Sequence, residues 1–198
     1  MGRPTREPGT ASRILDVAER LVQSQGFNGF SYADVAAELG ISKASLHYHF
    51  PGKAELGLAL ITRYASRFAD ALGEIDVEVS DVRAKLAAYA ALYASVLKDR
   101  RMCLCGMLAA DYETLPPPMR TAVVRFFDDN EAWLEGVLMR GSTEGVLHYE
   151  GAAREEAQLI IGALEGAMLV ARPYGAPERF HAAAHRLLSA LSTTLGAR

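Results

Sequence analysis

Two short amphipathic segments, joined by only two residues, constrain this chain more than any other feature. Ser31 precedes the first segment and Gly40 ends it, while Ser42 precedes the second segment, which runs to about Phe50. A serine before a helix accepts a hydrogen bond from a free backbone N–H, and glycine adopts the left-handed backbone that ends a helix. Because only Gly40 and Ile41 separate the segments, we expect Ile41 to be buried between two crossing helices, as in a helix-turn-helix.

The second segment has the size and chemistry of a helix that enters the major groove of DNA. Lys43, Ala44 and Ser45 at its start are small or point outward, and Leu46 on the opposite side can anchor the helix to a core. The aromatic residues 47–49 then offer further hydrogen-bond donors near the bases. The segment is therefore predicted to read DNA.

Two other features near this motif have alternative interpretations. Lys53 begins the next helix, where its charge opposes the helix dipole, so that a DNA phosphate is the favoured partner. His47 and His49 are two positions apart, which points them to different faces of a helix, and we do not expect them to bind a metal ion.

Hydrophobic periodicity predicts an all-α chain, without the alternation typical of strands and without an internal repeat. Residues 1–9 are expected to form a flexible arm, followed by a helix that Thr10 caps and Gly26 ends. An acidic, β-branched stretch at residues 76–81 is predicted to end the helix that starts at Lys53, near Gly73. Later helices are predicted at residues 82–100, 104–112, 116–140, 152–172 and 177–195, with a turn at 173–177.

Composition adds little about function. Half of the 198 residues are hydrophobic, enough for a sizeable core, and the net charge is −3. The charge is +1 over residues 1–53 and −4 over the rest, an asymmetry too weak to indicate DNA binding by itself. The N-terminus has no apolar signal core, and no apolar stretch reaches the length of a membrane span. We expect a cytoplasmic protein in which Cys103 and Cys105, too close together for an ordinary disulfide, stay reduced.

Residues 30–56, FSYADVAAELGISKASLHYHFPGKAEL, resemble the signature of the TetR family of repressors. Together with the helix before them, the resemblance covers about residues 10–60. One position departs from the family pattern, because His47 stands where the family usually has a tyrosine that contacts phosphate, with Tyr48 beside it. The matching residues are Ser31, Val35, Ala36, Gly40, Ile41, Ser42, Leu46, His49, Phe50 and Lys53.

The resemblance implies a regulator with two domains, a helix-turn-helix DNA-binding domain at residues 1–53 and a helical ligand-binding and dimerisation domain at residues 54–198. Such a protein binds palindromic operator double-stranded DNA as a homodimer and is released by a small-molecule effector. No cofactor is implied, and no catalytic motif is present. The residues expected at the DNA are Ser31, Ser42, Lys43, Ala44, Ser45, His47, Tyr48, His49 and Lys53.

The helix predicted at residues 152–172 is apolar nearly all round, so a partner must cover the face that a single monomer leaves open. Gly162 and Gly166 allow a second helix to approach closely. The alternative is an internal core for this helix and the last one. With the resemblance, the expected dimer interface consists of Leu159, Gly162, Gly166, Leu187, Leu188 and Leu191, and Leu195 continues the stripe.

Aromatic and methionine side chains in the second domain suit an apolar or aromatic effector, although such residues also build ordinary cores. Glu165 is more informative, because a carboxylate in an apolar run needs an arginine, a wet cavity or a polar group of a ligand. The candidate pocket residues are Tyr89, Tyr93, Met102, Cys103, Cys105, Met107, Phe126, Asn130, Trp133, Met139 and Glu165.

Two expectations concern regulation. The helix that starts at Lys53 leaves the DNA-binding unit and is the expected lever to the body, where Leu58, Leu60, Ile61 and Tyr64 can pack. The alternative function is a thiol-based redox-sensing regulator, which requires that residues 103 and 105 be exposed thiols of low pKa. Their apolar neighbours favour buried, inert thiols instead.

Overall fold

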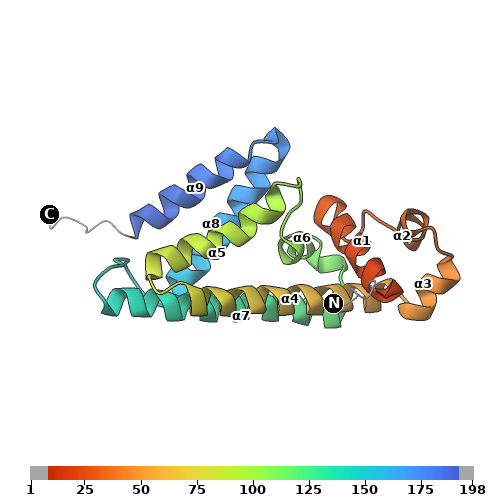
Figure 1. Ribbon diagram of the computed structural model, residues 1–198, viewed down its shortest axis with the longest axis horizontal. Coiled ribbons are helices and arrows are strands. Elements are labelled where there is room, and N and C mark those ends of the chain that lie inside the picture. The colour runs from red at the N-terminus through yellow and green to blue at the C-terminus, as the bar shows by residue number, and fades with distance from the viewer. Residues whose placement is uncertain (1–8, 192–198) are drawn as a thin grey trace, which may run out of the picture.

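The computed structural model describes residues 9–191, and over this range it contains helices and no strand, as the sequence predicts (Figure 1). The predicted arm lies outside this range except for Gly9, and so does Leu195. No described helix is long and apolar enough to span a membrane. The elements are α1 (Thr10–Gln25), α2 (Tyr32–Leu39), α3 (Lys43–His49), α4 (Lys53–Glu78), α5 (Val82–Leu97), α6 (Leu104–Ala110), the 3-10 turn η1 (Tyr112–Thr114), α7 (Pro117–Thr143), α8 (Ala153–Tyr174) and α9 (Pro177–Ala190).

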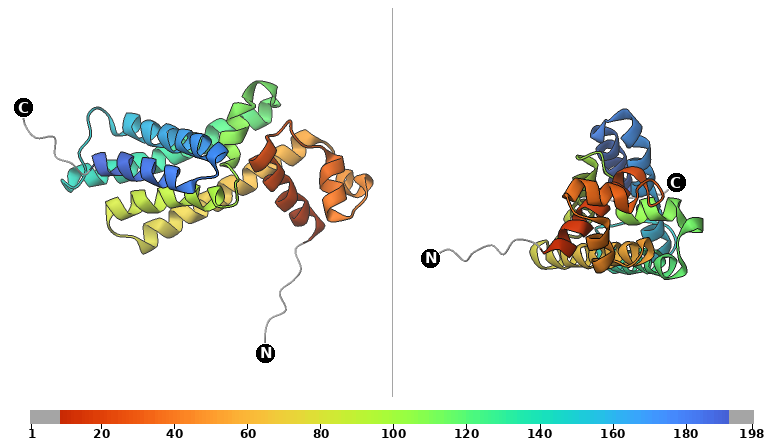
Figure 2. Two further views of the ribbon diagram at one scale, coloured as in Figure 1. Left: turned by 90° about the horizontal axis from the view of Figure 1, so that it is seen from above. Right: turned by 90° about the vertical axis from the view of Figure 1, so that its right-hand side faces the viewer.

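The helices form a small unit and a larger body. The small unit, α1 to α3, lies at one end of the elongated molecule (Figure 1). The long helices α4 and α7 pack along one side of the body, α5 and α8 pack on them, and α9 packs on α5 and α8 (Figure 2). Because α4 begins beside α3 and ends at the far side of the body, one continuous helix joins the two parts.

The small unit has its own core, built from one apolar face of each helix. Ile14 of α1, Val35 of α2 and Leu46 of α3 are fully buried, and Leu56 at the start of α4 closes the cluster. Burial of three or four such side chains contributes roughly 1.5–3 kcal/mol each. This packing holds α3 against the other helices by one side and leaves its other side free.

The body is centred on aromatic side chains from three helices. Tyr64 and Phe68 of α4 pack against Phe126 of α7, with ring centroids 5.6 Å and 5.3 Å away, and Phe68 also lies 6.0 Å from the rings of both Tyr89 and Tyr93 of α5. Offset and edge-to-face pairs at these distances are favourable beyond the area that they bury. The centre of the body is therefore filled.

Several predicted boundaries were wrong. Helix α4 does not end near Gly73 but continues to Glu78, because Ile75 is buried and the Asp76 carboxylate pairs with Lys85. Helix α5 ends at Leu97, and Arg100 adopts a positive φ of 58° in the loop that follows.

The ends of α8 and α1 also differ from the prediction. Pro173 lies in the last turn of α8 rather than in the following loop, and Gly175 ends the helix at φ 59°. Gly9, not Thr10, is the N-cap of α1, because the Arg13 N–H bonds to the Gly9 carbonyl.

Two predicted buried positions are only partly covered. Ile41 is half-buried, because the turn lies at the surface of the small unit. Leu58 is 37% exposed, whereas Leu60, Ile61 and Tyr64 of the same helix are buried as expected.

Candidate nucleic-acid interface and effector site

The turn between α2 and α3 has the predicted local geometry. Gly40 is left-handed at φ 65°, and the Ile41 N–H bonds to the Ala36 carbonyl at 3.1 Å. The Ser42 hydroxyl accepts the Ser45 N–H at 3.1 Å, so that Ser42 caps α3. These bonds satisfy backbone groups that the helix ends leave free.

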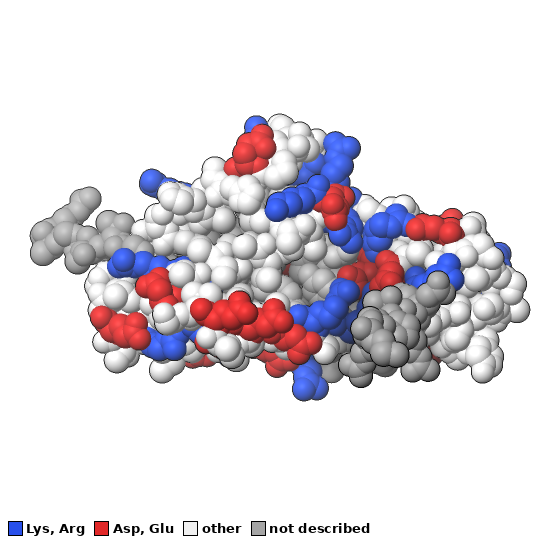
Figure 3. Space-filling view, in the orientation of Figure 1, with Lys and Arg blue, Asp and Glu red and all other residues white. Residues whose placement is uncertain are grey.

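Helix α3 presents its predicted DNA-facing side to solvent. Lys43 and Ala44 are exposed, Ser45 is half-buried, and Tyr48 is 84% exposed, while Leu46 on the other side is fully buried. Tyr48 is therefore accessible on the side of α3 that is predicted to face DNA. Figure 3 shows mixed charges and much uncharged surface at this end of the molecule on the face drawn, in line with the weak charge asymmetry of the sequence.

The residue that departs from the family pattern packs back toward its own unit. His47 Nδ1 lies 3.0 Å from the Pro51 carbonyl oxygen, and its ring centroid lies 4.8 Å from that of Tyr32. The Tyr32 hydroxyl donates to the Phe50 carbonyl at 2.9 Å, and burial, with the charge of Glu55, raises the pKa of Tyr32 to about 12. Tyr32 fixes the end of α3, a role that the sequence pattern did not reveal.

Ser31 and Lys53 both have partners inside the chain. The Ser31 hydroxyl and backbone N–H donate to the Asp34 carboxylate at 2.8 Å and 2.7 Å. Lys53 Nζ donates to the Phe30 carbonyl at 2.5 Å and lies 4.3 Å from the centroid of the Phe30 ring and 4.8 Å from that of Phe27. Desolvation lowers the pKa of Lys53. Lys53 therefore ties α4 to the loop before α2, and its phosphate contact stays a prediction.

A buried ion-pair cluster holds α1 on α4. Glu19 of α1 is 7% exposed, and its carboxylate accepts from Arg63 at 2.7 Å and also from Arg67. Arg63 additionally reaches Asp16 at 2.7 Å. Both oxygens of a buried carboxylate are thus paired, which offsets the cost of its desolvation.

Three more bonds join the small unit to the body. The Phe27 N–H donates to Asp111, just after α6, at 2.7 Å. The Met102 N–H donates to the Gln23 carbonyl at 3.1 Å, and Arg172 near the end of α8 donates to the Ser24 carbonyl. The end of α1 is therefore fixed by α6 and α8 as well as by α4, which sequence reasoning missed because all three contacts are long-range.

A groove of about 310 Å³ opens between α4 and α7. Three predicted pocket residues line it, namely Phe126, Asn130 and Trp133. The Trp133 indole N–H donates to Asp76 at 2.9 Å, and its ring stacks on Tyr89 with centroids 5.6 Å apart. The other residues along the groove are Ala65, Ala69, Leu72, Gly73, Asp76 and Asp129.

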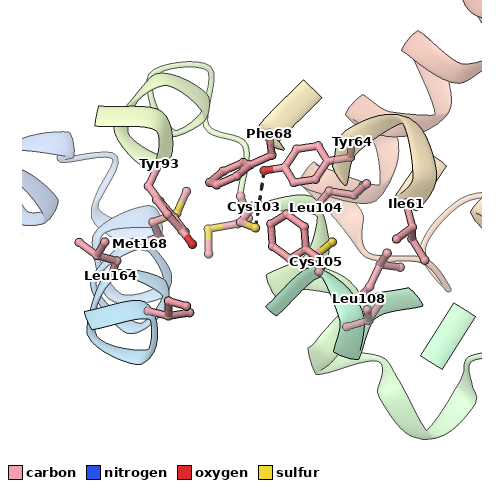
Figure 4. Close-up of a cluster of buried hydrophobic side chains, with 14 of the residues drawn as sticks. Ile61, Tyr64, Phe68, Tyr93, Cys103, Leu104, Cys105, Leu108, Leu164 and Met168 are labelled. Carbon is pink, nitrogen blue, oxygen red and sulfur yellow. Dashed lines mark hydrogen bonds between the residues drawn. The ribbon is translucent and has the colours of Figure 1, made fainter. Parts of the chain in front are cut away.

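The remaining pocket candidates are placed differently. Five of them are buried in the body, namely Tyr89, Tyr93, Met102, Cys103 and Cys105. Figure 4 shows Tyr93, Cys103 and Cys105 in a cluster of buried side chains. Met107 is half-buried on α6, where Arg172 lies 3.8 Å from its sulfur. Met139 is 56% exposed and does not line the groove described above.

Two family models match this chain. Residues 14–60 match the family model described as bacterial regulatory proteins, tetR family, and residues 68–187 match the tetracyclin repressor-like C-terminal domain. The chain belongs to the TetR family. It is thus a DNA-binding transcriptional regulator and not an enzyme.

Proteins that align with most of this chain are also transcriptional regulators. The crystal structure of a TetR-family transcriptional regulator from Agrobacterium tumefaciens is 33% identical, covers 92% of this chain and 97% of its own, and superposes with a TM-score of 0.89. The HTH-type transcriptional regulator LmrA of Bacillus subtilis is 26% identical over 80% of this chain and 84% of its own length. The HTH-type transcriptional repressor DhaR of Mycobacterium sp. strain GP1 is 22% identical over 79% of each chain.

The two thiols of this TetR-family chain lack the properties of redox sensors. Cys103 and Cys105 are fully buried, and burial raises the pKa of both well above the usual value. The Tyr64 hydroxyl lies 3.6 Å from the Cys103 sulfur, as the dashed line in Figure 4 marks. A redox sensor needs an accessible thiolate, so the condition for the alternative function is not met.

Helix α8 keeps one apolar side uncovered. Leu159 is 56% exposed and Leu169 is 61% exposed, and a side chain added at Gly162 or Gly166 would meet nothing within 4 Å. Leu187 of α9 is half-buried and lines a groove together with Leu159.

The other two predicted interface residues of α9 differ in burial. Leu191 is only 4% exposed and its carbonyl accepts the His148 N–H at 2.7 Å, so it belongs to the core of the protomer. Leu188 is half-buried and lines a cavity of about 350 Å³ between α5 and α9. The prediction for Leu191 was therefore wrong, because α9 uses this leucine to pack within the chain, whereas the place of Leu188 in the interface stays a prediction.

Proposed function

We propose that this protein is a cytoplasmic repressor that binds palindromic operator DNA as a homodimer and is released by a small, largely apolar or aromatic effector. The observation that carries the proposal is the capped, outward-facing start of α3, with Tyr48 exposed and Leu46 buried. A recognition helix needs this arrangement to insert its N-terminal residues into a major groove. The repressor DhaR among its relatives favours repression over activation.

The dimer is proposed to form through α8 and the exposed part of α9. The uncovered side of α8 combines Leu159 and Leu169 with two glycines that let a second helix approach closely. An exposed apolar side of this kind indicates a protein interface. Two copies related by a two-fold axis would present two α3 helices, and half-sites about 34 Å apart would match them.

The effector is proposed to enter the groove between α4 and α7. Its volume of about 310 Å³ lies at the lower end of small-molecule pockets, and its lining combines Phe126 and Trp133 with the polar Asn130. An aromatic ligand fits such a lining. Because α4 also begins the link to the DNA-binding unit, a ligand that moves α4 would move α3.

The switch is proposed to use α4 as its lever, with the bonds from α6 and α8 as restraints. A ligand shifts operator affinity only if it binds one lever position better than the other. The proposed coupling is about 1–3 kcal/mol and acts in both directions, so operator DNA must weaken effector binding by the same factor.

The test begins with selection of binding sites from genomic DNA by the full-length protein, followed by footprinting. We expect a palindromic site bound by a dimer, with affinity that falls steeply as salt rises. Tyr48→Ala should abolish sequence preference, whereas Val77→Ala, which truncates an equally exposed residue of α4, should leave binding unchanged. A monomer bound to a site without symmetry would contradict the proposal.

A further inference from the structure

Glu165 on α8 is a half-buried carboxylate for which the described part of the chain provides no counter-ion. Its Oε1 is buried and has no hydrogen-bond partner, and the one neighbour bonded to its carboxyl group is the Cys103 thiol. Two other acids in the described part of the chain differ from it, since Glu19 pairs with arginines and Asp76 pairs with Lys85. The fold supplies cations for those two acids and none for Glu165.

The space for this carboxylate is built into the neighbouring helix. Gly106 of α6 lies opposite Glu165, and a Cβ at that position would lie 2.3 Å from Oε2. Any other residue at Gly106 would displace the acid. The nearest arginine along α8, Arg172, is instead bound to the Ser24 carbonyl and the Met107 sulfur.

The surroundings of Glu165 are aromatic and stay uncharged. Burial raises the pKa of Tyr64, Tyr89 and Tyr93, and the charge of Glu165 adds to this effect, so the carboxylate lies near all three rings. Burial also raises the pKa of Cys103 and Cys105. Figure 4 shows Tyr64, Tyr93 and the two cysteines together with Leu164 and Met168 of α8.

A chain of hydrogen-bonded side chains leads from the groove toward this carboxylate and ends at Tyr93. Asn130 in the groove wall lies 3.4 Å from the Tyr89 hydroxyl, and the Tyr89 and Tyr93 hydroxyls are 3.1 Å apart. A ligand in the groove would reach Glu165 by turning these two tyrosines aside. Their rings are also suited to hold a cation by their faces.

We propose that Glu165 recognises an effector that carries a protonated amine on an aromatic or apolar frame. This rests on the proposed function, since it names the chemical class of the effector in that function. The amine supplies the counter-ion that the fold omits, and the frame occupies the groove between α4 and α7. A hydrogen-bonded charge pair in a dry site is stronger than a neutral hydrogen bond.

The experiment uses three probes with one frame, namely 2-phenylethylamine, 2-phenylethanol and phenylacetate. Calorimetry on the full-length protein gives their affinities, and Trp133, the single tryptophan of the chain, reports occupation of the groove by its fluorescence. We expect the wild type to bind the amine at least about tenfold more tightly than the alcohol, and phenylacetate most weakly. Glu165→Gln should reduce the preference for the amine to about twofold or less and leave alcohol binding unchanged.

Two control variants locate the effect. Glu156→Gln removes the same charge from the same helix, and Asp129→Asn removes an acid from the groove itself. Both should keep the preference for the amine. A preference lost in Asp129→Asn and retained in Glu165→Gln would overturn the inference, and so would equal binding of amine and alcohol or no amine binding at millimolar concentration.

The pH dependence supplies an independent readout. Burial raises the pKa of Glu165 to about 7, and the Cys103 hydrogen bond opposes this shift. Because the amine binds the ionised carboxylate, its affinity should rise from about pH 6 to about pH 8, while the affinity of the alcohol stays constant. These binding measurements contain no DNA. If the amine binds but a separate measurement finds operator affinity unchanged, the proposed function is contradicted and this inference still stands.

Discussion

Asp111 accepts a hydrogen bond from the backbone N–H of Phe27 at 2.7 Å, across 84 positions of the sequence. The bond joins the end of α6 in the body to the loop that leads into the helix-turn-helix. Next to it, Gly26 has a φ of 82°, and a Cβ there would lie 2.9 Å from the same carboxylate. The bond therefore connects α6 to the DNA-binding unit by a route that does not pass through α4.

The first prediction follows from this bond. Asp111→Ala leaves the Phe27 N–H unpaired, so we expect a loss of about 1–3 kcal/mol in the free energy of unfolding. Amide exchange at Phe27 should accelerate more than the global loss explains. Hydrogen exchange and urea unfolding measure both, with Glu113→Ala, a largely exposed acid nearby, as the control. Unchanged exchange at Phe27 would show that the bond does not restrain the unit.

The second prediction separates phosphate contacts from base contacts. Lys53→Ala should weaken binding to all DNA sequences alike and reduce the salt slope by about 1. Tyr48→Phe and Ser45→Ala should alter sequence preference. Because Lys53 also contacts Phe27 and Phe30, Lys53→Met, which keeps the apolar stem, is the matched control for stability. If Lys53→Ala alters the sequence preference and the other two variants do not, the proposed placement of α3 on DNA is wrong.

The third prediction concerns stability against pH. The pKa of Glu165 is raised by burial from 4.5 to about 7, so between these values the folded state binds more protons than the unfolded state. The stabilisation is complete below about pH 4.5 and is lost as the pH rises through about 7, a difference of roughly 2–4 kcal/mol. Glu165→Gln should not show this loss. Urea unfolding from about pH 5 to about pH 8 gives the free energy of unfolding of both proteins. If this free energy changes with pH in the same way in both, the raised pKa of Glu165 is contradicted.

The fourth prediction tests the uncovered side of α8. Leu159→Glu places a charge on the proposed two-fold interface, where it would face its own copy, and should raise the dimer dissociation constant at least about tenfold. Val77→Glu, at an 88% exposed position on α4, should leave it unchanged. Analytical ultracentrifugation gives both values. A Leu159→Glu protein that dimerises like the wild type would place the interface elsewhere.

Local sequence determined the DNA-binding unit. The caps at Ser31 and Ser42 and the stop at Gly40 act over three or four residues, so their spacing in the sequence predicts both helices and the turn. The buried side of α3 at Leu46 follows from helical periodicity in the same way. These features depend on interactions between residues that are close together in the sequence.

Only the tertiary structure decided how that unit is attached and which candidate residues form a site. The Asp111 to Phe27 bond, the partners of Lys53, the inward position of Leu191 and the missing counter-ion of Glu165 all depend on segments far apart in sequence. A periodic pattern shows that a residue is apolar or on one face, but not which distant helix covers it. That choice is made when the helices pack, because burial energy depends on the neighbours that a side chain meets.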